Sequence, residues 1–157
     1  MDKRCCFTGH RVIPDDKYVK IMQSLRHHIL KLYTEGYTVF NIGGAQGFDT
    51  MAAQAVLKLK ENFPDVQLHL YLPYPGQSDK WSGTDREVYR HILRHSDKAV
   101  YSAQDYTPGC INSRNRALVD NADICIAFCN QTSGGTVYTI GYALDNNVKV
   151  INIAAEI

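Results

Sequence analysis

The feature that most constrains the fold is a regular alternation of short apolar runs with longer segments of helical periodicity. The apolar runs are continuous, as in strands that are buried on both faces. In residues 17–35 the apolar side chains recur three or four positions apart, as at Ile21, Leu25 and Ile29. Helices that connect parallel strands produce this order. We therefore predict an α/β fold, Rossmann-like and doubly wound, with a mostly parallel sheet and helices on both faces.

The expected elements follow one another without a repeat, a low-complexity segment or a linker. Strands are predicted at residues 4–8, 37–42, 66–72, 98–101, 123–128 and 148–153. Helices are predicted at residues 17–35, 49–61, 85–96, 110–121 and 134–145. A length of 157 residues suits a single domain with a substantial core, so we expect one domain over residues 1–157.

Charge and cysteine content limit the classes of function. The chain has 17 Lys and Arg against 16 Asp and Glu, a net charge of +1, which does not favour nucleic acid or an anionic membrane as a partner. No apolar run is long enough to span a bilayer, and no signal peptide is apparent. The five cysteines are odd in number and include no C-x-x-C pair. We expect reduced thiols and a cytoplasmic location.

A glycine-rich turn follows the predicted strand at residues 37–42. Its residues Gly43, Gly44, Gly47 and Asp49 have the spacing G-G-x-x-G-x-D, which is neither the dinucleotide fingerprint nor the P-loop. One interpretation is that the glycines let backbone N–H groups approach a phosphate. The other is a tight turn in which Asp49 caps the following helix and binds nothing. Asp49 is also a candidate to accept a hydrogen bond from a ribose.

Two further glycine-containing turns are expected at the same edge of the sheet. The carboxyl ends of parallel strands meet there, and ligands of such sheets bind at this edge, which we call the rim. The residues concerned are Gly9, His10 and Arg11 after the first strand, and Gly134, Gly135 and Thr136 before the last helix. We expect phosphate to lie against Gly134, Gly135 and Thr136 and against Gly43 and Gly44.

Two arginines near the start of a predicted helix can supply positive charge to this rim. Arg114 and Arg116 are two positions apart, so they cannot share a helical face. We expect Arg114 to face the ligand and Arg116 to form an ion pair.

Trp81, the single tryptophan, is either a stacking surface for a base or a lid that packs on the core. His91 and His95 have helical spacing but no further ligands, so no metal site is predicted.

Several of these motifs, taken in order, resemble the SLOG superfamily, which joins DNA-processing protein DprA/Smf with the LOG nucleotide phosphoribohydrolases. Within it the chain is most similar to the small, single-domain YpsA type. The resemblance implies a Rossmann-like fold and a pocket for nucleotides or nucleotide-derived ligands. It is carried by residues 7–11, 43–49 with 52–53, 72–77 with Trp81, 114–116, 119–123 and 134–139.

One position departs from the hydrolase pattern. LOG hydrolases carry a motif of the form P-G-G-x-G-T-x-x-E, in which the glutamate is catalytic. When Gly135 and Thr136 are aligned with the Gly-Thr of this motif, Thr139 takes the position of the glutamate. We therefore expect binding of a nucleotide or a derivative such as ADP-ribose, as a sensor or regulator, and assign no catalytic residue. The alternatives are cleavage of an N-glycosidic bond in such a ligand and binding of single-stranded DNA as in DprA. The sequence leaves open whether the chain forms a homo-oligomer.

Overall fold

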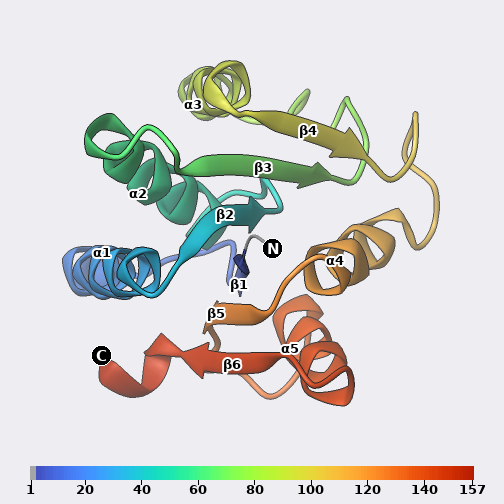
Figure 1. Cartoon of the computed structure of the whole chain (residues 1–157). Helices are drawn as coiled ribbons and strands as arrows, with labels where there is room; N and C mark the ends of the chain where they lie inside the picture. The colour runs from blue at the N-terminus through green and yellow to red at the C-terminus, as the bar shows by residue number, and fades with distance from the viewer. Residues whose placement is uncertain (1–2) are drawn as a thin grey trace.

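In the computed structural model, which describes residues 3–157, helices and strands alternate as the sequence predicts (Figure 1). Within these residues, six strands form one parallel sheet in the order β4-β3-β2-β1-β5-β6. The strands are β1 (Lys3–Gly9), β2 (Tyr37–Ile42), β3 (Gln67–Leu72), β4 (Lys98–Tyr101), β5 (Ile124–Phe128) and β6 (Lys149–Asn152). The helices are α1 (Tyr18–Thr34), α2 (Phe48–Asn62), α3 (Gly83–His95), α4 (Cys110–Asp120) and α5 (Gly135–Asp145), with the short 3-10 helices η1 (Asp15–Lys17) and η2 (Ile153–Glu156). The predicted fold class is confirmed.

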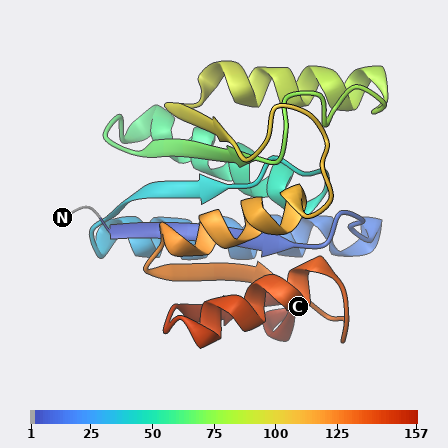
Figure 2. The ribbon, with the colours of Figure 1, turned by 90° about the vertical axis from the view of Figure 1, so that its right-hand side faces the viewer.

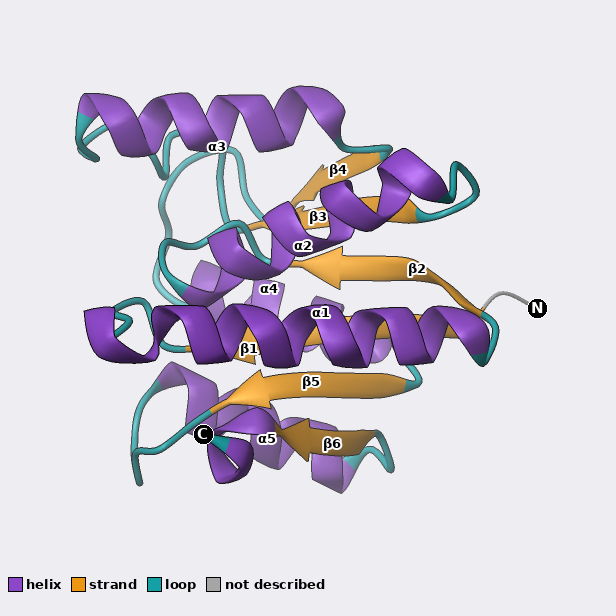
Figure 3. Cartoon of the chain, turned by 90° about the vertical axis from the view of Figure 1, so that its left-hand side faces the viewer, coloured by secondary structure: helices purple, strands orange, loops and turns teal. Residues whose placement is uncertain are grey.

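Helices cover both faces of the sheet. Figure 3 shows α1, α2 and α3 on one face, and Figure 2 shows α4 and α5 on the other. Successive side chains of β1 point into these two layers: Cys5 and Phe7 pack in the apolar core that includes α1 and α2, whereas Cys6 packs with Leu118 and Val119 of α4. Coverage on both faces explains why the strands are continuously apolar in sequence.

The position of β1 creates the crevice in which a ligand can lie. β1 pairs with β2 on one side and with β5 on the other. The chain first builds the sheet outward from β1 to β4, then crosses back through α4 to β5. Because the connections on the two sides of β1 run in opposite directions, the loops at the carboxyl ends of β1 and β5 diverge. Gly9 is paired with Phe128 at this end, so the turns after both strands border the crevice.

The observed element boundaries agree with the predicted ones to within two residues, and those of β2 and β4 are identical. The largest difference is at the start of α3, which begins at Gly83 rather than residue 85. The hydroxyl of Ser82 accepts a hydrogen bond from the backbone N–H of Asp85 at 3.2 Å, which caps the helix earlier than its apolar pattern indicates. None of the helices in residues 3–157 has the length and apolar character needed to cross a lipid bilayer.

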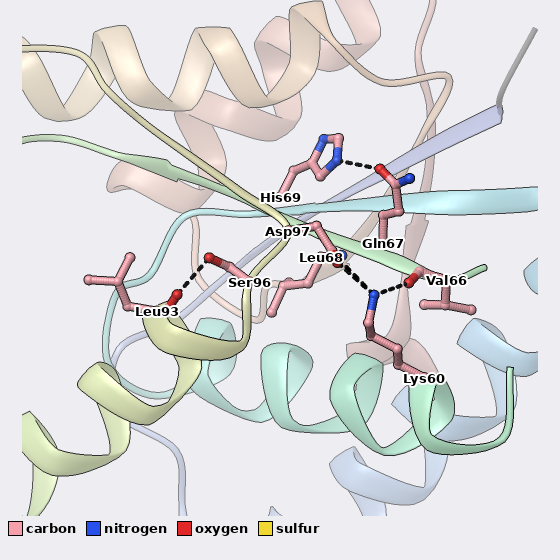
Figure 4. Close-up of polar contacts among 8 residues, drawn as sticks. All are labelled: Lys60, Val66, Gln67, Leu68, His69, Leu93, Ser96 and Asp97. Carbon is pink, nitrogen blue, oxygen red and sulfur yellow. Dashed lines mark hydrogen bonds and ion pairs between the residues drawn. The ribbon is translucent and has the colours of Figure 1, made fainter. Parts of the chain in front are cut away.

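A polar network fixes β3 at the end away from the rim (Figure 4). The Lys60 ammonium donates to Val66 O at 2.7 Å and to both carboxylate oxygens of Asp97 at 2.8 and 2.9 Å. Asp97 also accepts the backbone N–H of Leu68 at 2.8 Å. Burial raises the pKa of Asp97, but the Lys60 and Leu68 donors outweigh it and hold that pKa below its ordinary value. The network joins α2, β3 and the α3–β4 connection, and its role is structural.

Candidate functional site

A cavity of about 330 Å³ lies at the carboxyl ends of β1 and β5, and we call it the main cavity. Its walls come from four parts of the chain that are distant in sequence. The lining residues are Phe7 to Val12 after β1, Ala45 and Asp49 near the start of α2, Ile111, Arg114, Asn115 and Leu118 of α4, and Gln131, Gly135 and Thr136 before and within α5. The topology thus brings the turns after β1 and β5 and the start of α4 to one space, as the rim hypothesis predicts.

The turn after β1 is held against the loop after β5. His10 Nε2 accepts the backbone N–H of Asn130 at 3.1 Å, and its ring lies edge-on to Phe128 at 5.7 Å. Burial lowers the pKa of His10 below its ordinary value. The Asn130 N–H donor at Nε2 favours the imidazole tautomer with its proton on Nδ1.

The glycines at residues 43–47 serve close packing and do not line the main cavity. Gly47 has φ +77°, and a Cβ there would lie 2.2 Å from Arg11 O. The neighbouring N–H of Phe48 donates to His10 O at 3.0 Å, which ties this turn to the turn after β1. Gly44 has φ +73°, and a Cβ there would lie 2.4 Å from Leu72. Gly43 and Gly44 do not line this cavity, so the phosphate contact expected at these two residues cannot form there. Ala45 and Asp49 line the cavity instead.

Asp49 is buried in the wall of the main cavity and stabilises the turn. Its Oδ2 accepts the backbone N–H of Ala45 at 3.1 Å. The N-cap position of α2 is Gly47, without a side-chain cap, so the predicted capping role of Asp49 is wrong. Burial raises the pKa of Asp49, and the nearby Arg114 guanidinium and the Ala45 N–H only partly oppose this.

This raised pKa gives a pH-dependent prediction. A carboxyl group that binds its proton more tightly in the folded than in the unfolded state loses stabilising effect as the pH rises above its unfolded value of about 4. The substitution Asp49→Asn removes the titration but keeps an acceptor for Ala45 N–H. We expect the stability of the Asn variant relative to the unmodified protein to rise as the pH increases above about 4, measured by urea unfolding. A difference that stays constant with pH would contradict this assignment.

Arg114 points into the site, as predicted, and is only 3% exposed. Its Nη1 donates to Gly43 O, and its Nε donates to Asn115 Oδ1 at 2.9 Å. Burial lowers the pKa of this arginine, while Asp49 opposes the shift. The guanidinium is therefore a fixed positive group between the glycine-rich turn and α4.

Arg116 lies on a different face of α4. Its Nη1 donates to the Tyr138 hydroxyl at 2.9 Å, and its Nη2 donates to Ser113 Oγ at 3.1 Å. The predicted ion pair of Arg116 is wrong: among the ion pairs of residues 3–157, none involves it. The phenol and hydroxyl oxygens within its reach provide acceptors in place of a carboxylate.

The start of α5 forms the open wall of the main cavity. Gly134 has φ +111°, and a Cβ at Gly134 or Gly135 would meet no atom within 4 Å. Gly135 and the buried Thr136 line the cavity. The first N–H groups of a helix lack partners within it and carry a partial positive charge, so they favour an anion. Of the glycines predicted to contact phosphate, this pair has the free approach that such contact needs.

Thr139 supplies no acid group to the cavity. Its side chain is buried in α5, and its hydroxyl donates to Gly135 O at 2.8 Å. Asp49 is thus the carboxylate that lines the main cavity. The described residues bring together no group of three or more His, Cys, Asp or Glu side chains that could hold a metal ion.

Several lining residues were not singled out from the sequence. Ile111, Asn115 and Leu118 line the main cavity together with Arg114. Their spacing of three or four positions places them on one helical face, so the assignment of Arg114 to the site could have identified them. Gln131 lies in the loop after β5, where no periodicity points to it.

Comparisons with known proteins point to one family. A family model for YpsA, described as the YspA SLOG family, matches residues 7–151. A UPF0398 protein of Bacillus licheniformis is 29% identical over 135 residues, which make up 82% of this chain and 73% of that protein. The UPF0398 protein YpsA of Bacillus subtilis is 25% identical over 135 residues, 82% of this chain and 74% of that protein. A UPF0398 protein of Staphylococcus epidermidis is 30% identical over 115 residues, 72% and 60% of the two chains.

Solved structures with the same fold belong to a DNA-processing protein. DNA processing protein A (DprA) from Streptococcus pneumoniae superposes with a TM-score of 0.67 at 15% identity, over 95% of this chain and 49% of that chain. The protein of the same name from Helicobacter pylori, whose structure addresses its single-stranded DNA binding mode, gives a TM-score of 0.67 at 16% identity. That match covers 94% of this chain and 63% of the other. The likeness shows a shared fold, and the chain spans only about half to two thirds of these proteins.

Proposed function

Because the chain belongs to the YspA SLOG family, whose motifs the sequence resembles, we propose that its main cavity binds a nucleotide or a nucleotide-derived ligand. In this proposal a phosphate group lies against the start of α5, at Gly134, Gly135 and Thr136. Arg11 and Arg114 supply the compensating positive charge. The protein then acts as a sensor or regulator, in the reducing cytoplasm that its five free cysteines favour.

The observation that carries the proposal is the convergence of three anion-attracting features on one cavity. Arg114 is a buried guanidinium fixed by Gly43 O and Asn115. Arg11 is exposed at the cavity mouth, and the start of α5 opens onto the same space. Arginine and a helix N-terminus both bind phosphate oxygens through N–H donors. The volume of about 330 Å³ falls within the range of roughly 300 to 1,000 Å³ for small-molecule pockets.

We expect adenine nucleotides or ADP-ribose to stabilise the folded protein. A ligand at about 100 times its dissociation constant adds roughly 2.7 kcal/mol, because it binds only the folded state. Thermal unfolding with AMP, ADP and ADP-ribose measures this shift. The substitution Arg11→Ala is expected to weaken the shift, whereas Arg94→Ala, at an exposed position in the last turn of α3, is its matched control. No shift with any compound of a broad nucleotide panel would contradict the proposal.

We infer binding without hydrolysis of a glycosidic bond. Cleavage through a positively charged transition state requires an accessible carboxylate. Thr139 occupies the hydrolase glutamate position and donates its proton within α5. Asp49 is buried and already accepts the Ala45 N–H, and burial raises its pKa.

Single-stranded DNA is the second candidate, because the Helicobacter pylori protein with this fold binds it. Binding of single-stranded DNA requires a groove with enough cations to neutralise successive phosphates. The main cavity offers two cations, Arg11 and Arg114, which are too few for the successive phosphates of a strand. We therefore expect a dissociation constant for oligo-dT no better than about 10⁻⁴ to 10⁻⁶ M, measured by fluorescence anisotropy at about 0.15 M salt. Saturable nanomolar binding there would show instead that DNA is the physiological partner.

A further inference from the structure

The main cavity continues along the rim into a smaller hollow of about 90 Å³, which we call the side pocket. Arg11, Ala45 and Ile111 line both spaces, so the two are neighbouring parts of one groove. A volume of 90 Å³ is far below the roughly 300 Å³ at which small-molecule pockets begin. The side pocket therefore suits one part of a ligand whose remainder occupies the main cavity.

The chemistry of the side pocket differs from that of the main cavity. Apart from the three shared residues, the side pocket is lined by the aromatic residues Tyr74 and Trp81, by Pro73, and by Gln46 and Gln77. These walls combine flat aromatic surface with neutral polar groups. Such a combination suits a planar ring with hydrogen-bonding edges, and it offers little to a second phosphate.

Both aromatic rings are held in place by neighbours. The Trp81 ring packs against Tyr89 with centroids 5.3 Å apart at an angle of 80°. The Tyr74 ring packs against Tyr106 at 5.8 Å and 74°. Edge-to-face contacts of this kind fix ring planes. Rings that are ordered before binding lose little conformational entropy when a ligand arrives, so they favour affinity.

The two glutamines offer hydrogen-bond acceptors beside these rings. Gln46 Nε2 donates to Asp85 Oδ2 at 3.1 Å, and Gln77 Nε2 donates to the Tyr89 hydroxyl at 3.3 Å. A carboxylate only accepts, so it fixes the orientation of the Gln46 amide. In the hydrogen-bond network of residues 3–157, neither amide Oε1 has a partner. Both oxygens can accept the N–H groups at the edge of a base.

From this groove we infer that the side pocket is the subsite for the base of a nucleoside phosphate whose phosphate lies in the main cavity. The inference rests on the proposed function, and it names the part of the ligand that the proposed function leaves unplaced. It assigns Tyr74 and Trp81 as the stacking walls, with Gln46 and Gln77 at the edge of the base.

The single tryptophan provides a direct readout, because Trp81 is the only one in the chain. Its fluorescence is followed during titration with ADP, GDP, CDP and UDP, and with pyrophosphate and ribose 5-phosphate as probes without a base. Thermal unfolding with the same compounds reports phosphate binding separately. We expect at least one nucleoside diphosphate to change the Trp81 fluorescence saturably and to bind more tightly than either probe without a base.

Variants of Tyr74 test the stacking wall. Tyr74→Ala is expected to weaken the binding of the nucleoside diphosphate with the highest affinity roughly 5- to 150-fold, the range for loss of one stacking partner. The binding of pyrophosphate is expected to stay unchanged. Tyr74→Phe keeps the ring and is expected to retain the affinity. Equal affinity for compounds with and without a base, together with unchanged Trp81 fluorescence, would overturn the base subsite while the phosphate site stands. If no compound in either set stabilises the protein, the proposed function fails and the base subsite with it.

Discussion

Replacing Arg114 with methionine is expected to lower the free energy of unfolding by about 3 kcal/mol, because it removes one partner of a buried charged cluster. Arg114 is 3% exposed, and its guanidinium bonds Gly43 O and Asn115. Without it, the buried Asp49 loses its main compensating cation and keeps only the smaller effect of Arg11, and the Gly43 carbonyl loses its donor. The variant should also lose nucleotide binding. Urea unfolding and thermal shift measure the two effects.

Two further variants separate charge coupling from loss of volume. Arg116→Met makes the same change two positions along α4, where the arginine bonds Tyr138 and Ser113, and a much smaller loss is expected. Adding Asp49→Asn to Arg114→Met removes the isolated carboxylate, so the double variant should be more stable than the sum of the two single-variant effects predicts. Strict additivity of the two effects would show that the two groups are not coupled.

Gly47→Ala is the second substitution with a large expected effect. Its φ of +77° costs an alanine about 1–2 kcal/mol. The added Cβ would lie 2.2 Å from Arg11 O and 2.6 Å from His10 O, and forcing apart two packed backbone segments costs roughly a further 1–3 kcal/mol. We expect a total loss of about 3 kcal/mol, with ligand binding impaired because Arg11 is displaced.

Two other glycines serve as matched controls for this substitution. Gly109 has φ +86° but no atom within 4 Å of an added Cβ, so Gly109→Ala should cost only the conformational part, about 1–2 kcal/mol. Gly141 lies inside α5 with open space and no positive φ, so alanine there should stabilise by roughly 0.5–1 kcal/mol. If Gly47→Ala cost no more than Gly109→Ala, the proposed steric contact with Arg11 would be wrong.

The sheet could be predicted from sequence because its strands leave a direct signal. Residues of β5 are buried on both faces, since Ile126 packs in the core cluster with α1 and α2 whereas Cys125 packs with Leu118 of α4, so the run is apolar throughout. The alternation with helices then requires a parallel sheet. The first residue of a helix was harder to predict. In α3 the Ser82 cap lies before the first residues of the apolar pattern, so the helix begins earlier than that pattern indicates.

The site was predicted less well, because the same glycine motif can serve two purposes. Gly43, Gly44 and Gly47 permit close packing of protein segments, whereas Gly135 lies open at the cavity. Sequence spacing does not distinguish these cases, since the contacts of Gly47 with Arg11 and His10 come from a segment far away in the chain. The helical spacing of Arg114 and Arg116 predicted that only one of them faces the cavity, but it did not decide which one, and it did not predict the acceptors of Arg116.

The central claim is that the rim groove binds a nucleotide, and amide NMR of the isotope-labelled protein titrated with ADP-ribose tests it most directly. The account predicts saturable shifts at residues 9–12, 110–115 and 131–136 around the main cavity, and at residues 45–46 and 73–81 around the side pocket. The amides near the Lys60–Asp97 network, at the opposite end of β3, should remain unchanged. No saturable shift at millimolar ligand with ADP-ribose or any nucleotide of the panel, or shifts centred away from both groups of segments, would contradict it.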